Sequence, residues 1–237
     1  MTGSAMFNAI YVLVHCLYDI LEYIYCNLKE IGDAINNKFS HEIRIAPDQL
    51  RKIPKHLTVI LGKEEPSYKD LANIILWCLV HRIAFVSFYD WKGVLNKNED
   101  KFSSEVEKIK PEGSHIIWHT NSSSSLKNGF TGNKIHVKIL TEEDGKLGLV
   151  NFTKNLVTKN REDLSTESLI CSIHKYFAFP EPEVALYCDQ TILLRNYPPW
   201  QTRITEFFSV KTHHNISYKT FFETLSLYNK TEQRCGK

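Results

Sequence analysis

This chain of 237 residues lacks the short motifs by which common enzyme classes are recognised. It contains no GxGxxG, GxxxxGK[ST], GxSxG or HExxH pattern, so it offers no glycine-rich phosphate loop, nucleophile elbow or helical zinc pair. Its six cysteines form no CxxC pair, which argues against structural zinc and against a disulfide framework. The net charge is only +2, and this excludes the broad basic surface that nucleic acid requires.

The ten histidines do not form a recognisable metal-binding pattern either. His115 and His119 are four residues apart and His213 and His214 are adjacent, but neither pair has cysteine or carboxylate neighbours at metal-ligand spacing. We therefore predict no metal site in this domain. Asp90 follows a predicted strand, where α/β proteins often carry functional groups, and helix capping explains it equally well.

Charged residues are rare at the amino terminus. Residues 5–18 are nearly all apolar, and Asp19 and Glu22 interrupt the apolar character that follows. No lysine or arginine precedes this run, which disfavours a cleaved signal peptide. The uninterrupted part is shorter than the roughly 20 residues that a spanning helix needs. Three interpretations stay open: a poor transmembrane helix, a helix in the membrane interface, or a helix packed on the domain or a partner.

We assign residues 1–28 to a hydrophobic membrane-anchor helix and residues 29–46 to a polar linker. The lysines and arginines near the anchor all follow it. If the helix spans the membrane, that bias keeps the main domain, residues 47–237, in the cytosol.

Within the main domain, strand and helix signals alternate. Apolar runs predict five strands, at residues 56–61, 83–89, 134–140, 183–188 and 204–210. Capping signals and apolar stripes predict helices, one opened by Pro66 and Ser67 and others at residues 98–110, 147–160, 165–177 and 217–229. Residues 112–133, rich in serine, are predicted to form a loop. The alternation predicts an α/β fold with a mainly parallel central sheet flanked by helices.

The chain ends on Arg234-Cys235-Gly236-Lys237, directly after the last predicted helix. A guanidinium binds phosphate through two hydrogen bonds, and a glycine lets backbone N–H groups approach an anion closely. Most chain ends are solvated and frayed. A tail of this composition could nevertheless bind a phosphate outside its own domain.

Three stretches, taken in order, resemble the cis-prenyltransferase family, which condenses isopentenyl diphosphate onto an allylic diphosphate. They are residues 56–61, the late region 182–208, and the Arg234-x-Gly236 end. The resemblance covers residues 49–237 and implies the fold of that family.

The departures from this family concern the residues that bind magnesium and diphosphate. Catalytic members carry Asp-Gly-Asn-Arg-Arg after the first strand, and in this chain the matching positions read Gly62-Lys63-Glu64-Glu65. The positions of two late phosphate-binding arginines carry Tyr187 and Leu193. Two carboxylates beside a diphosphate would repel it in a partly dry site. The resemblance therefore implies a scaffold that has lost its own diphosphate site.

Together these features resemble the Nogo-B receptor type of accessory subunit in dehydrodolichyl diphosphate synthase. This resemblance implies a subunit that is inactive alone and pairs with a catalytic cis-prenyltransferase, which holds most of the Mg²⁺. Arg234 and Gly236 would complete the shared site in trans, on farnesyl and isopentenyl diphosphate, for the dolichol synthesis that supports protein glycosylation. Trp200, Phe207 and Phe208 are then candidates for the dimer interface, and the anchor would hold the complex in the lipid of the endoplasmic reticulum membrane.

Two other functions stay open at this point. One is a self-sufficient cis-prenyltransferase of unusual sequence. The other is a membrane-anchored binding or receptor protein that kept the fold.

Overall fold

The computed structural model describes residues 50–119, 133–158, 165–177 and 179–232, together with Tyr11, Val14, His15 and Leu21. The chain divides into two units, Met1–Ala46 and Pro47–Lys237, and the second of them carries the α/β fold. The predicted anchor and linker belong to the first unit. Apart from the four single residues, which are helical, they lie outside the described residues and stay predictions. No helix within the described part combines the length and the apolar character that a membrane crossing requires.

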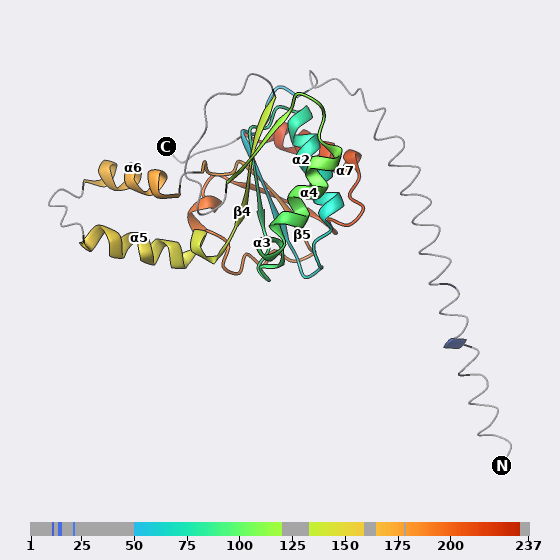
Figure 1. The fold of residues 1–237 in the computed structure, drawn as a ribbon, viewed down its shortest axis with the longest axis horizontal. Helices are drawn as coiled ribbons and strands as arrows, with labels where there is room; N and C mark the ends of the chain where they lie inside the picture. The colour runs from blue at the N-terminus through green and yellow to red at the C-terminus, as the bar shows by residue number, and fades with distance from the viewer. Residues whose placement is uncertain are drawn as a thin grey trace, which may run out of the picture. The chain divides into compact units, whose positions relative to one another are not determined.

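The second unit is built on a six-stranded sheet in which every pair of neighbouring strands is parallel (Figure 1). The strands are β1 (His56–Leu61), β2 (Phe85–Tyr89), β3 (His115–His119), β4 (Lys134–Leu140), β5 (Val184–Cys188) and β6 (Glu206–Val210). Their order is β3-β4-β2-β1-β5-β6. The strands that follow β1 lie first on one side of it, with β2, and later on the other side, with β5, so the order reverses between β1 and β5. Ligands of open α/β sheets bind at such a switch point, beyond the carboxyl ends of the strands.

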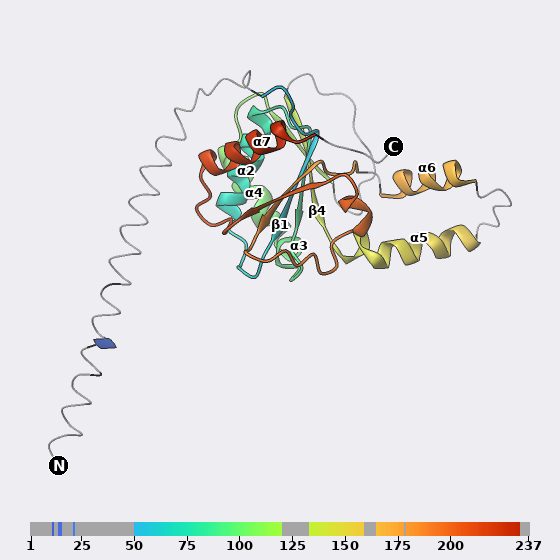
Figure 2. The same cartoon turned by 180° about the vertical axis from the view of Figure 1, so that it is seen from behind.

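The helices confirm the predicted alternation. They are α2 (Tyr68–Val80), α3 (Val94–Lys97), α4 (Glu99–Ile109), α5 (Lys146–Thr158), α6 (Thr166–Phe177) and α7 (Tyr218–Lys230), with 3₁₀ turns η2 (Glu142–Asp144) and η3 (Pro199–Thr202). Helices α2, α4 and α7 lie on one side of the sheet, whereas α5 and α6 extend away from it (Figures 1 and 2). The α/β class with a parallel sheet is therefore confirmed, and the sheet is parallel throughout.

The side of the sheet that faces α2, α4 and α7 is apolar. Val59 and Phe88 are in register on this side, and the Phe88 ring meets Phe102 of α4 edge to face at 5.2 Å between centroids. From α2, Leu71 and Ile74 are fully buried. Burying one such side chain stabilises the fold by about 1.5–3 kcal/mol, so this contact between helices and sheet forms the main core.

The opposite side of the sheet carries buried polar groups. His56 donates from Nδ1 to the Pro180 carbonyl at 2.7 Å, and its Nε2 lies 2.9 Å from Ser87 Oγ. On β4, Lys138 forms a buried ion pair with Asp144 of η2. Burial lowers the pKa of His56 to about 3, so this imidazole is neutral at physiological pH.

The structure corrects the predicted loop at residues 112–133. His115–His119 forms β3, which among the described strands lies at the edge of the sheet and pairs with β4. All five of its residues are half-buried, so no clear alternation of exposed and buried positions marks it in the sequence. The predicted helix 98–110 corresponds to α4, and the short α3 that precedes it was missed.

Candidate functional site at the carboxyl edge of the sheet

The loop after β1, Gly62–Glu65, lies at the switch point of the sheet. The loop after β2 contacts it, because Trp91 Nε1 donates to the Gly62 carbonyl at 3.0 Å. The loop after β6 contacts it as well, because the Thr212 hydroxyl donates to the carboxylate of Glu64. Segments far apart in sequence therefore meet around the positions that the resemblance matches to the diphosphate-binding residues of catalytic cis-prenyltransferases.

Gly62 occupies a position with no room for a side chain. A Cβ added there would lie 2.2 Å from the Cys188 carbonyl oxygen and 3.0 Å from the Cβ of Asp189. Real Cβ atoms do not approach a backbone oxygen so closely, so an aspartate at this position would require the backbone of β1 or β5 to move. The sequence thus lacks the aspartate expected from the resemblance, and the backbone at position 62 leaves no room for its side chain.

Both glutamates of the loop interact with groups of the same chain. Lys92 Nζ lies 2.7 Å from Glu65 Oε1, and Glu64 accepts the hydrogen bond from Thr212. Both side chains remain partly exposed, with exposed fractions of 69% for Glu65 and 48% for Glu64. The loop thus carries two carboxylates at the sheet edge, one of them paired with Lys92, and the prediction that it repels a diphosphate stays a prediction.

The two positions that would carry late arginines in catalytic members are joined by a hydrogen bond. The Tyr187 hydroxyl accepts from the backbone N–H of Leu193 at 2.8 Å. Tyr187 is buried, whereas the Leu193 side chain is exposed. The nearby Arg195 stacks on the Trp91 ring at 3.7 Å from the centroid, a cation–π contact that occupies its guanidinium. No finding assigns Tyr187 or Leu193 a role, so their identification as lost-site positions stays an interpretation.

The three predicted interface residues are half-buried. Trp200 packs on Phe177 at 4.4 Å between ring centroids, and its indole N–H is buried without a hydrogen-bond partner in the described ranges. Phe207 packs against the core cluster around Tyr187, and Phe208 follows it on β6. Because β6 ends the sheet, Phe207 and Phe208 lie at an edge that a partner could reach, although core packing explains Phe207 equally well, and Trp200 lies in η3.

Arg234 and Gly236 lie outside the described residues, which end at Glu232. Their predicted phosphate-binding role therefore stays a prediction. Asp90, in contrast, is explained as a cap. One of its carboxylate oxygens accepts from the N–H groups of Val94 and Leu95 at 2.6 and 3.1 Å, at the start of α3.

One hollow lies at this edge of the sheet, and another lies on α5. One of about 380 Å³ is lined by the ends of β2 and β4 and contains both cations and carboxylates, among them Lys92, Lys97 and Glu142. The other, of about 590 Å³, is an apolar groove on α5 lined by Leu149, Val150, Thr153, Lys154, Val157 and Thr158. The first suits a polar ligand, and the second suits an apolar surface of another molecule.

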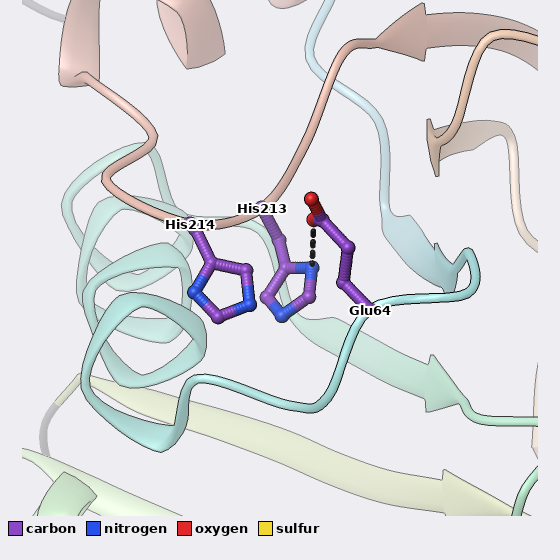
Figure 3. A group of neighbouring side chains, drawn as sticks. All are labelled: Glu64, His213 and His214. Atoms are coloured by element: carbon purple, nitrogen blue, oxygen red, sulfur yellow. Dashed lines mark ion pairs between the residues drawn. The ribbon is translucent and has the colours of Figure 1, made fainter. Parts of the chain in front are cut away.

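The histidine pair 213–214 lies beside Glu64, and this juxtaposition was missed in the sequence. One ligand atom from each of Glu64, His213 and His214 lies within 4.8 Å of the others (Figure 3). His213 Nδ1 faces Glu64 Oε2 at 3.8 Å, and His214 Nε2 lies 2.8 Å from the Glu65 carbonyl oxygen. The sequence spacing around this pair offers no carboxylate, and the structure brings Glu64 to it from a distant part of the chain.

Burial is the main cause that lowers the pKa of His213. The neighbouring His214 lowers this pKa further, while Glu64 and the Glu65 carbonyl oppose the shift. His213 is therefore a neutral imidazole, the form that can accept a proton or bind a metal. The other pair, His115 and His119, lies on β3, where His119 Nε2 is 2.8 Å from His136 Nδ1.

Comparisons with known proteins point to one group of relatives. No protein-family model matches the chain. The chain is 31% identical over 204 residues to the dehydrodolichyl diphosphate synthase complex subunit Nus1 of Mus musculus, covering 79% of this chain and 67% of the mouse protein. Its identity to the human subunit NUS1 is 29% over 212 residues, which is 83% of this chain and 72% of that protein. The Schizosaccharomyces pombe subunit is 27% identical, with 82% of this chain and 81% of that protein covered.

Solved structures show the same fold at low identity. Lavandulyl diphosphate synthase from Lavandula x intermedia superposes with a TM-score of 0.58 at 13% identity, covering 78% of this chain and 98% of that one. A probable undecaprenyl diphosphate synthase from Campylobacter jejuni gives a TM-score of 0.54 at 15% identity, covering 78% of this chain and all of the other. The fold of these synthases is thus present in this chain, with the altered edge described above.

Proposed function

We infer the function of this chain from its family, since it belongs to the NUS1-type dehydrodolichyl diphosphate synthase complex subunits. We propose that it is the non-catalytic subunit of such a complex. It pairs with a catalytic cis-prenyltransferase chain and completes that chain's active site. The complex extends farnesyl diphosphate with isopentenyl diphosphate to a polyprenyl diphosphate for dolichol synthesis, which supports protein glycosylation.

The closed loop after β1 is the observation that carries this proposal. Gly62 lies against the Cys188 carbonyl, so the position has neither a carboxylate nor space for one. Glu64 and Glu65 place negative charge where a diphosphate would lie and interact with Thr212 and Lys92. A chain with such an edge is suited to a supporting role beside a catalytic partner.

The same loop does not fit Mg²⁺. This ion prefers octahedral oxygen ligands, usually carboxylates together with substrate phosphates. Gly62 offers no ligand, and Glu65 is paired with Lys92. We therefore assign the Mg²⁺ of the reaction to the catalytic partner, where it would supply positive charge to stabilise the departing diphosphate.

The carboxy-terminal tail would reach the partner's site. It follows α7, which ends at Lys230, and carries Arg234 and Gly236. The guanidinium would donate two hydrogen bonds to a substrate diphosphate, and the backbone N–H groups around Gly236 would add further donors. Such contacts accelerate the reaction when they strengthen as charge develops on the leaving group.

Exposed apolar surface supports pairing. Val150 and Val157 of α5 are 48% and 72% exposed along the apolar groove, and Phe207 and Phe208 are half-buried on the edge strand β6. Apolar and aromatic side chains of this kind form the cores of protein–protein interfaces. We propose that the catalytic chain covers part of this surface.

Residues 1–28 would anchor the complex in the endoplasmic reticulum membrane, with the main domain in the cytosol. A long polyprenyl product is poorly hydrated, so its synthesis at a lipid surface avoids a large solvation cost. The apolar composition of residues 5–18 supports this assignment.

A chain-elongation assay tests the proposal. The full chain, the candidate catalytic chain and the co-purified pair are each given Mg²⁺ and both diphosphates. We expect no product from this chain alone and the highest turnover from the pair. Product from this chain alone would identify a self-sufficient enzyme, and failure to form a complex would favour a binding or receptor protein.

The tail is tested within the pair. Arg234→Ala should reduce turnover by roughly 100- to 1,000-fold, the usual cost of removing one donor to developing charge. Lys230→Ala removes an exposed cation at the end of α7 and serves as the control. Unchanged turnover in Arg234→Ala, with the pair still assembled, would refute the role of the tail in trans.

A further inference from the structure

We propose that Glu64, His213 and His214 form a binding site for one Zn²⁺ ion, which connects the loop after β1 to the loop after β6. This site goes beyond the proposed function, because it requires neither the catalytic partner nor its Mg²⁺. It uses residues at which the sequence showed no metal-ligand spacing.

The geometry brings three ligands of suitable chemistry together. Glu64 lies in the loop that precedes α2, and the two histidines lie in the segment that precedes α7 (Figure 3). The ligand atoms are within 4.8 Å of one another, and the pair His213 Nδ1 and Glu64 Oε2 is 3.8 Å apart. Ligands about 2.0–2.2 Å from a tetrahedral zinc are roughly 3.4 Å apart. Side-chain movements of about 1 Å would therefore complete the site.

His213 provides an independent indication of a ligand. The side chain is fully buried, and its Nδ1 has no hydrogen-bond partner among the described residues. Leaving such a buried group unpaired is unfavourable, because it has given up its hydrogen bond to water. This nitrogen faces the Glu64 carboxylate across the 3.8 Å gap, so a cation bound between them would remove the cost.

The surroundings of His213 allow the tautomer that metal binding needs. Its Nε2 lies 3.1 Å from the Glu65 carbonyl oxygen and also 3.1 Å from the backbone N of Ser67. In the metal-free chain Nε2 can accept from Ser67. With a metal on Nδ1, the proton moves to Nε2 and is donated to the Glu65 carbonyl, and the hydrogen bond from Ser67 is given up. Metal-bound histidines commonly donate their other N–H to a carbonyl in this way.

The donor set favours zinc over harder cations. Two imidazoles and one carboxylate match the ligands of zinc sites, whereas Mg²⁺ and Ca²⁺ prefer oxygen ligands alone. His214 flanks His213 with ring centroids 4.3 Å apart and is only half-buried, so its ring can turn towards the metal. Lys92 pairs with Glu65, which leaves the charge of Glu64 for the cation. A water molecule would take the fourth position.

The test uses the purified full chain, stripped of metal with a chelator and titrated with Zn²⁺ alone. All proteins carry Cys171→Ser, because this exposed thiol could bind zinc by itself. Competition with a chromophoric chelator gives the affinity, and elemental analysis gives the stoichiometry. We expect one tightly bound Zn²⁺ per chain and a higher thermal unfolding midpoint, since a ligand that binds only the folded state stabilises it.

Two variants and a matched control locate the ion. Glu64→Gln and His214→Ala should each weaken Zn²⁺ binding at least tenfold, by the loss of one ligand. Glu223→Gln removes an exposed carboxylate of α7 that pairs with Lys219 and lies outside the ligand set, and it should leave the affinity unchanged. Circular dichroism of the metal-free proteins checks that each variant is folded. If Glu64→Gln does not fold, His214→Ala still tests the site.

X-ray absorption at the zinc edge identifies the ligand atoms. We expect nitrogen and oxygen neighbours at about 2.0–2.2 Å. Sulfur neighbours at about 2.3 Å would place the ion on cysteines and overturn the proposal. So would absent binding, or equal affinities in wild type, Glu64→Gln and His214→Ala.

Discussion

The loop after β1 and the exposed side of α5 differ in how many of their side chains interact with other residues of the same chain. At the loop after β1, Trp91 donates to the Gly62 carbonyl and Lys92 pairs with Glu65. Along α5, in contrast, Val150 and Val157 expose apolar surface to solvent. The first surface is polar and closed by the chain itself, and the second is apolar and open.

This contrast agrees with the proposed supporting role beside a catalytic chain. In an active site at the sheet edge, polar side chains must be available to bind the substrate. Side chains that pair with one another are not available for this. An exposed apolar groove is hydrated in the isolated chain and contributes to binding when a partner excludes water from it. Substitutions at each surface, taken from the largest expected effect to the smallest, test this contrast.

Restoring the family's aspartate should damage the closed edge. Gly62→Asp places a Cβ against the Cys188 carbonyl, and such overpacking costs about 3 kcal/mol of unfolding free energy. Urea denaturation of the full chain measures the loss, with Lys63→Asp at the exposed neighbouring position as the control. If Gly62→Asp were as stable as wild type, the edge would be open rather than closed.

A charge in the α5 groove should weaken the complex. Val157→Glu places a carboxylate on the most exposed valine of the groove, and we expect a loss of about 2 kcal/mol, or roughly 30-fold in Kd for the catalytic chain. Asn155→Glu introduces the same charge on α5 at an exposed position outside the groove. Equal affinities for the two variants, measured by surface plasmon resonance, would show that the partner does not cover this groove.

Acid should destabilise the domain through the polar side of the sheet. The folded-state pKa of His56 is about 3 because of burial, whereas that of an unfolded histidine is about 6.5. The unfolded chain therefore binds a proton below pH 6.5 that the folded chain does not. The free energy of unfolding falls for this reason as the pH is lowered from 6.5 towards 3. His119, whose pKa burial lowers to about 4, acts in the same direction.

At pH 5 the expected loss from His56 is about 2 kcal/mol, from about 1.4 kcal/mol per pH unit. Urea denaturation at pH 7 and pH 5 measures it, and His56→Asn should remove much of the difference. A difference that is the same in wild type and His56→Asn would assign the pH dependence to other groups.

The smallest effect is expected at the ion pair of the closed edge. Glu65 is 69% exposed in its pair with Lys92, and exposed pairs contribute little because water and salt screen them. Glu65→Gln should change the unfolding free energy by less than about 1 kcal/mol. A loss similar to that of Gly62→Asp would show that the charge pair, rather than the packing at Gly62, closes the edge.

Much of the fold follows from local pattern. The run His56–Leu61 is wholly buried as predicted, and α7 begins directly after Ser217, whose hydroxyl accepts from the Thr220 N–H. The strand β3 was missed because an edge strand with half-buried residues has weak alternation. The family assignment also came from the sequence, since the late region and the Arg234-x-Gly236 end stand in the family's order.

The sequence by itself determined the alternation of strands and helices, the family, and the absence of the aspartate at position 62. Burial periodicity and motif order are local properties, so they can be recognised without coordinates. Only the tertiary structure decided that Gly62 has no room for a side chain and that Glu64 lies beside His213. Contacts of this kind depend on which strand ends meet at the sheet edge, and strand order is a property of the whole fold.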